Sequence, residues 1–147
     1  MWKQSYYNRE KGIRANPLIE YWDKRGHDFS LMRKSNDYDF GRKVYTALRG
    51  VLNANSTMLD IGAGPGYFTI PFAQHIKSVM AIEPSKGMVA VLKENVKEAG
   101  VENFYVIEEL IQDIPQDGSP DFQFDLVAVS LVLWMFPDVW TRLLQME

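Results

Sequence analysis

The sequence predicts an α/β protein built on a doubly wound parallel sheet, and two observations lead to this prediction. Short apolar segments of strand length alternate with longer segments whose apolar residues recur at helical spacing. One apolar segment, residues 124–129, is nearly continuous, which is typical of a strand buried on both faces of a sheet. With right-handed connections between the strands, we expect the strand order 3-2-1-4.

The composition is that of one globular domain. The chain has 147 residues, of which 46% are hydrophobic and 24% are charged, and this content is sufficient for a core. The longest apolar run, residues 126–136, is too short to span a membrane, and the amino end has no signal pattern. We therefore expect a cytoplasmic protein without a membrane partner. Because the chain has no cysteine and two histidines, we also expect no metal site.

The charge is distributed unevenly along the chain. Residues 1–50 carry 11 Lys and Arg against 6 Asp and Glu, whereas the remainder carries 5 against 13. Such a basic segment is typical of proteins with an anionic partner, but it also occurs where two faces of one domain pack together. We favour the second interpretation, which disfavours a nucleic-acid partner without excluding it. Residues 1–52 are expected to form an arm and helices that act as a lid, and residues 53–147 form the core.

Two helices are expected before the first strand. Residues 17–25 read as a short helix with proline in its first turn, ended by Gly26. A second helix is expected to begin at a cap formed by Asp37 or Asp39 and to run to about Leu52, because its apolar residues recur at helical spacing. This second helix is expected to lie against the sheet.

Three glycines follow the first predicted strand at every second position. The strand begins near Met58, and Gly62, Gly64 and Gly66 come directly after it. Glycine allows a sharp turn of the backbone, and its missing Cβ allows a ligand to approach the main chain. A helix over residues 67–76 follows, and the free N–H groups at its start are expected to face that ligand.

The spacing of these glycines distinguishes between two kinds of cofactor. The dinucleotide pattern G-x-G-x-x-G has its third glycine where this chain has Tyr67, so binding of a pyrophosphate is disfavoured. The acid-x-Gly-x-Gly-x-Gly run instead resembles motif I of class I S-adenosylmethionine-dependent methyltransferases. In that family the acid and the loop hold the methionine part of the cofactor. The resemblance assigns this role to Asp60, Gly62, Ala63, Gly64 and Gly66.

A carboxylate follows the second predicted strand. This strand, residues 78–82, ends at Glu83, 21 positions after the first glycine. A carboxylate at this strand tip can accept hydrogen bonds from both hydroxyls of a ribose. Residues 83–88 resemble the acid-x-Ser-x-x-Met signature of the same family. The resemblance adds Pro84 and Met88 to the cofactor site, with Met88 packed near the adenine.

The next elements extend the predicted cofactor site. A helix over residues 86–99 is expected to be capped by Ser85, and residues 103–107 are expected to form the third strand. In the loop that follows, the resembled family sets an acid or amide against the adenine amino group. Here that contact would come from Gln112, from Asp113 or from the backbone.

The fourth strand completes the part of the fold that the sequence indicates. Ser130 lies at its carboxyl end, beside the expected cofactor and where the acceptor approaches, and Asp138 is expected to cap a further helix. The Rossmann-like fold of the family has seven strands, of which four are found here. The fourth strand would therefore be an exposed apolar edge, and we expect a homodimer through it.

The resemblance implies an S-adenosylmethionine-dependent methyltransferase that acts on a small-molecule acceptor. Methyl transfer needs positioning and a dry cavity more than it needs catalytic side chains. His27, Tyr7, Tyr21 and Glu109 are candidate bases, but each residue type is more often structural, so we assign no base. Two alternatives remain open. The basic, aromatic amino-terminal segment would suit an RNA methyltransferase, and the incomplete fold would suit a non-catalytic fragment or binding module.

Overall fold

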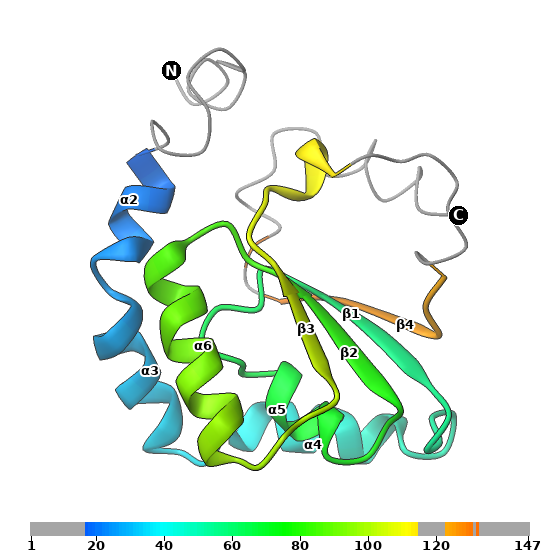
Figure 1. Ribbon diagram of the computed structural model, residues 1–147. Coiled ribbons are helices and arrows are strands. Elements are labelled where there is room, and N and C mark those ends of the chain that lie inside the picture. The colour runs from blue at the N-terminus through cyan, green and yellow to red at the C-terminus, as the bar shows by residue number, and fades with distance from the viewer. Residues whose placement is uncertain (1–16, 115–122, 131, 133–147) are drawn as a thin grey trace.

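The computed structural model describes residues 17–114, 123–130 and 132. These residues contain a four-stranded parallel sheet in the order β3-β2-β1-β4, so the predicted Rossmann-like, doubly wound sheet is confirmed. The predicted amino-terminal arm before residue 17 and the helix after Asp138 lie outside the described residues. The strands, shown in Figure 1, are β1 (Thr57–Ile61), β2 (Ser78–Ile82), β3 (Phe104–Ile107) and β4 (Leu126–Val129).

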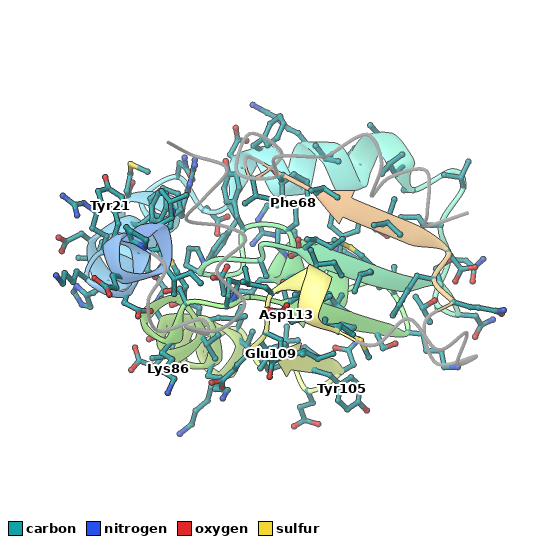
Figure 2. All side chains as sticks on the ribbon, turned by 90° about the horizontal axis from the view of Figure 1, so that it is seen from above. Tyr21, Phe68, Lys86, Tyr105, Glu109 and Asp113 are labelled. Carbon is teal, nitrogen blue, oxygen red and sulfur yellow. The ribbon has the colours of Figure 1, made fainter. Side chains whose placement is uncertain are left out.

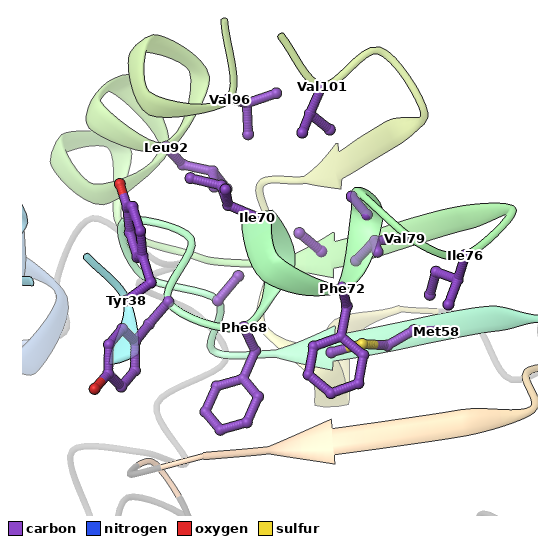
Figure 3. Packing of buried hydrophobic residues seen from close by; sticks show 14 residues of the cluster. Tyr38, Met58, Phe68, Ile70, Phe72, Ile76, Val79, Leu92, Val96 and Val101 are labelled. Carbon is purple, nitrogen blue, oxygen red and sulfur yellow. The ribbon is translucent and has the colours of Figure 1, made fainter. Parts of the chain in front are cut away.

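Successive residues of each strand enter two different hydrophobic clusters. In β1, Met58 belongs to the larger cluster, whereas Leu59 and Ile61 belong to the smaller one. Figure 3 shows the larger cluster, in which Phe72 lies beside Met58 of β1 and Leu92 of α6 lies beside Ile70. Because side chains alternate between the two faces of a strand, the apolar residues of each strand supply both clusters.

Three helices are associated with the face of the sheet that carries the larger cluster. They are α4 (Asp39–Leu48), α5 (Thr69–Ala73) and α6 (Lys86–Glu98). Two further helices, α2 (Pro17–Asp23) and α3 (Gly26–Lys34), lie on the outer side of α6, which separates them from the sheet in Figure 1. The described chain therefore has an additional helical layer beside α6. The division at residue 52 stays a prediction.

Ser85 caps α6 as predicted. Its hydroxyl oxygen accepts a hydrogen bond from the backbone N–H of Met88, which satisfies one of the free donors at the helix start. The ends of other elements differ from the prediction. The helices α4 and α5 are shorter than expected, and β4 begins at Leu126 rather than at residue 124. Asp125 instead joins two strands, because its Oδ2 accepts a hydrogen bond from the backbone N–H of Thr57 at 2.7 Å.

The prediction for the helices before the first strand was partly wrong. Gly26 begins α3 rather than ending a helix. A Cβ at this position would lie 2.5 Å from the carbonyl oxygen of Gly87, which belongs to α6. This glycine therefore allows α3 to approach α6. Neither Asp37 nor Asp39 caps α4. The N-cap is Tyr38, which has a φ of 54° and a buried side chain in the larger cluster, so packing replaces a side-chain cap.

The smaller cluster leaves part of its sheet face exposed. Val127, Leu59, Met80 and Tyr105 form one row across the paired strands. Val127 is 40% exposed and Tyr105 is 64% exposed, and Figure 2 shows Tyr105 on the outside of the described structure. The edge strands of the described sheet are β3 and β4. The homodimer through β4 stays a prediction. None of the described helices has the length and apolarity needed to cross a membrane.

The contact between α3 and α6 predicts the effect of a small substitution. Gly26→Ala places a methyl group 2.5 Å from a backbone oxygen, which cannot rotate away. We expect the free energy of unfolding, measured by urea denaturation, to fall by about 1–3 kcal/mol. Gly50→Ala is the matched control, since its Cβ meets no atom within 4 Å, and it should change stability by less than about 0.5 kcal/mol. Equal effects of the two substitutions would contradict the packing role.

Candidate functional site

The carboxyl ends of β1, β2 and β4 surround a cavity of about 300 Å³. Ligand cavities in proteins begin at about this volume. Ligands of doubly wound sheets bind at this edge, where the strand order reverses. The predicted site residues that line the cavity are Asp60, Gly62, Ala63, Gly64, Glu83, Pro84, Met88 and Ser130.

The carboxylate of Glu83 joins the loops that follow β1 and β2. Its Oε2 accepts a hydrogen bond from the backbone N–H of Gly64, and its Oε1 accepts one from the backbone N–H of Ser85, both at 2.9 Å. The side chain is only 7% exposed. The structure therefore places Glu83 directly beside the glycine turn, with open space next to both.

The glycines of the turn have different roles. Gly64 has a φ of +54°, and a Cβ built on it would meet no atom within 4 Å, so its main chain borders open space. Gly66 has a φ of +96° and lies under α6, where its Cβ would be 2.8 Å from Leu92 Cδ1. Gly66 does not line the cavity, although it was predicted to contact the cofactor. Its role in the structure is close packing of the turn against α6.

Asp60 connects the end of β1 to the start of α5. Its Oδ2 accepts a hydrogen bond of 2.6 Å from the hydroxyl of Thr69, and the residue is 2% exposed. Burial raises the pKa of Asp60 to about 6, against the lowering effect of the hydrogen bonds from Thr69. Burial likewise raises the pKa of Glu83 to about 7, against the hydrogen bonds from Ser85 and Gly64. Both carboxyl groups therefore have pKa values that burial raises well above those of exposed acids.

The loop after β3 forms an apolar part of the cavity wall. It contains a short 3-10 helix, η3 (Ile111–Asp113), and Leu110 and Ile111 line the cavity. Asp113 is exposed and does not line the cavity, so the structure does not bring this predicted residue to the site. The side chain of Gln112 lies outside the described part of the chain. An adenine contact from Gln112 or from the backbone of this loop stays a prediction.

The helices α2 and α3 supply a wall that the sequence did not reveal. Trp22, Phe29 and Arg33 line the cavity. No helix was predicted over residues 26–34, so Phe29 and Arg33 were missed. The helical spacing of Phe29 and Arg33, four positions apart, was the available signal.

Asp23 holds this wall in place. Its Oδ1 accepts hydrogen bonds from the hydroxyl of Ser85 at 2.7 Å and from the backbone N–H of Gly87 at 3.1 Å. These contacts join the end of α2 to the start of α6, where a helix favours negative charge. Among the residues that the structure describes, no three acidic or histidine side chains gather closely enough to hold a metal ion.

A family of known proteins matches most of the core of this chain. The family is described as a methyltransferase domain, and the match covers residues 58–146. The chain belongs to this family. The methyltransferase domain includes the glycine turn, Glu83 and all four strands except the first residue of β1. The predicted resemblance to class I S-adenosylmethionine-dependent methyltransferases is therefore confirmed.

Relatives of this methyltransferase domain differ in their named activities. The uncharacterized methyltransferase YcgJ of Bacillus subtilis is 30% identical over 101 residues, which are 69% of this chain and 38% of that protein. A probable ribosomal RNA small subunit methyltransferase A of Methanosphaera stadtmanae is 33% identical over 93 residues, covering 62% of this chain and 32% of the relative. The chain thus spans well under half the length of either relative.

A solved structure supports the fold of the methyltransferase domain. The structure of a putative S-adenosyl-L-methionine-dependent methyltransferase from Methanococcus maripaludis superposes with a TM-score of 0.66 at 20% identity. The superposition covers 84% of this chain and 56% of the other chain. At this identity the likeness concerns the arrangement of helices and strands.

The raised pKa of Glu83 predicts how stability depends on pH. The unfolded carboxyl titrates near 4.5 and the folded one near 7, so between these values the folded state binds more protons. The free energy of unfolding therefore falls as pH rises through this window, by an amount on the order of 1–3 kcal/mol from this group. We expect Glu83→Gln to remove this part of the slope in urea denaturation measured from pH 4.5 to 8.

The exposed Glu94 provides the control for this experiment. Glu94→Gln removes the same charge from the surface of α6 and should leave the slope unchanged. If Glu83→Gln and Glu94→Gln keep the same dependence on pH as the native chain, Glu83 does not have a raised pKa.

Proposed function

We propose that this domain binds S-adenosylmethionine in the cavity and transfers its methyl group to a small-molecule acceptor. The observation that carries the proposal is the position of Glu83 beside the glycine turn at an open cavity of about 300 Å³. Family membership supports the same chemistry. The cofactor and its acceptor would meet at the carboxyl ends of the strands, as ligands of doubly wound sheets do.

The residues of the cavity suit the parts of this cofactor. Each carboxylate oxygen of Glu83 accepts one backbone N–H and keeps a lone pair for a ribose hydroxyl. The missing side chain of Gly64 lets the methionine part approach the main chain. Met88, Leu110 and Ile111 provide an apolar wall against which an adenine can pack.

The chain contributes position and exclusion of water rather than acid–base groups. When bound, the cofactor supplies a methyl group on a positively charged sulfur, and the acceptor atom bonds to this carbon as the carbon–sulfur bond breaks. The candidate bases His27, Tyr21 and Glu109 do not line the cavity, and Tyr7 lies outside the described residues. Because none of these described candidate bases lines the cavity, their placement favours an acceptor atom that needs no strong base. The leaving group needs no acid either, since the sulfur of the cofactor is already positively charged.

The wall formed by α2 and α3 favours a small acceptor. Trp22 and Phe29 give this side of the cavity an aromatic surface, which suits a compact ligand better than a flat nucleic-acid surface. In this proposal residues 17–34 are the lid of the acceptor side.

An RNA acceptor is the second candidate, because a relative is named a ribosomal RNA methyltransferase. Part of the charge of the described basic segment is already paired within this chain. Lys34, Arg42 and Lys43 are paired with acids of this chain, which reduces the charge available to phosphates. A gel shift with ribosomal and transfer RNA at low salt distinguishes the two acceptors, and a salt-sensitive shift would favour RNA.

Calorimetry with S-adenosylhomocysteine tests the cofactor site of the 147-residue chain. We expect saturable binding below about 1 mM, and at least tenfold weaker binding to Glu83→Ala, which corresponds to about 1.4 kcal/mol. The lost contacts are those of the carboxylate with the ribose hydroxyls. Glu94→Ala, on the exposed surface of α6, should bind like the native chain.

The same titration has an outcome that contradicts the proposal. If a folded native chain binds neither S-adenosylmethionine nor its demethylated product at millimolar concentration, the cavity is not a site for this cofactor.

A further inference from the structure

Arg33 is the only cation among the described residues that line the cavity. Its guanidinium carbon lies 4.4 Å from the centre of the Tyr67 ring and 4.7 Å from that of the Phe29 ring. These two aromatic contacts hold the guanidinium group in place.

Two buried donors on this wall have no hydrogen-bond partner in the described structure. They are Nε of Arg33 and Nε1 of Trp22. Both side chains also contact Phe29, since the Trp22 and Phe29 rings meet edge to face with centroids 5.3 Å apart. Buried polar groups in proteins are nearly always hydrogen-bonded, so two unpartnered donors around one ring indicate a place for an acceptor group.

The acids of the cavity do not neutralise Arg33. Asp60 is bonded to Thr69, and Glu83 is bonded to the backbone N–H groups of Gly64 and Ser85. Among the described residues, Arg33 has no ion pair. The cavity therefore contains an uncompensated cation between aromatic rings, which is a suitable setting for a planar carboxylate.

We propose that Arg33 and Trp22 form a carboxylate-binding end of the cavity. The carboxylate comes either from the methionine part of the cofactor or from the methyl acceptor, and the inference rests on the proposed function for its ligands. Arg33 would donate to the carboxylate oxygens, and the indole N–H of Trp22 would supply a further donor.

Two nucleosides test whether the carboxylate belongs to the methionine part of the cofactor. S-adenosylhomocysteine carries a carboxylate, whereas 5′-methylthioadenosine has the same nucleoside and thioether without the amino-acid part. If Arg33 binds the cofactor carboxylate, Arg33→Met should weaken S-adenosylhomocysteine at least tenfold and leave 5′-methylthioadenosine unchanged. Equal weakening of both ligands indicates a purely structural role and overturns the proposal.

Benzoate and benzamide test whether the carboxylate belongs to the methyl acceptor, because the two molecules have the same shape and differ in charge. Calorimetry is performed with the chain alone and with the chain saturated by S-adenosylhomocysteine. If the acceptor supplies the carboxylate, benzoate should bind the native chain at least tenfold more tightly than benzamide, and Arg33→Met should abolish this preference. The proposal is overturned if Arg33→Met changes neither this preference nor the affinity for S-adenosylhomocysteine.

Arg25 provides the matched control. Its guanidinium carbon also lies over an aromatic ring, 3.9 Å from the centre of Tyr21, but Arg25 does not line the cavity, and Tyr21 lies at the periphery in Figure 2. Arg25→Met should leave all four affinities unchanged, and urea denaturation establishes that both variants fold. A native chain that binds neither nucleoside contradicts the proposed function, and the benzoate comparison on the chain alone then still tests Arg33.

Discussion

A buried carboxylate between two loops organises the site. Glu83 satisfies one backbone N–H of the glycine turn and one of the loop before α6, and little of its side chain is exposed. A buried carboxyl group is tolerated only where hydrogen bonds replace those it made with water. The backbone N–H groups of Gly64 and Ser85 supply these hydrogen bonds to Glu83. The carboxylate fixes the loops, and the loops hold the carboxylate beside the cavity.

The outer helical layer depends on a second set of polar contacts. The Nδ2 of Asn95 donates to the hydroxyl of Ser30 at 2.8 Å and to the carbonyl oxygen of Pro65 at 2.9 Å. Together with Asp23, this buried amide joins α3, α6 and the glycine turn. The aromatic wall is therefore attached to the same main chain that borders the cavity, which gives the cavity a defined shape. An anchored wall suits methyl transfer, where alignment of the reacting atoms accounts for much of the rate.

Features that depend on neighbouring residues could be predicted from the sequence. The strand order follows from the alternation of elements, the cap of α6 from Ser85, and the turn from the spacing of its glycines. Gly26, in contrast, was interpreted as a helix stop because its local pattern is the same in either case. A glycine is needed at position 26 because the backbone of Gly87 lies close to it. Gly87 is 61 positions away, so no local sequence pattern contains this contact.

The same limit applies to the cavity wall. Asp23 contacts Ser85 across 62 positions, and Arg33 reaches the cavity only because α3 packs beside α6. The resemblance placed an adenine contact at Gln112, at Asp113 or at the backbone of the loop after β3, whereas the residues of this loop that line the cavity are Leu110 and Ile111. Residues whose role depends on packing between distant segments are visible only once the fold is known.

The central claim is that the space between the glycine turn and Glu83 is a nucleoside site. Heteronuclear NMR of the labelled chain during titration with S-adenosylhomocysteine tests it most directly. The account predicts that the largest shifts occur at the amides of Gly62, Gly64 and Ser85 and at the methyl group of Met88, with little change at Ala47 on α4. Shifts that are absent, or that are confined to α4 and the outer edge of β3, would contradict it.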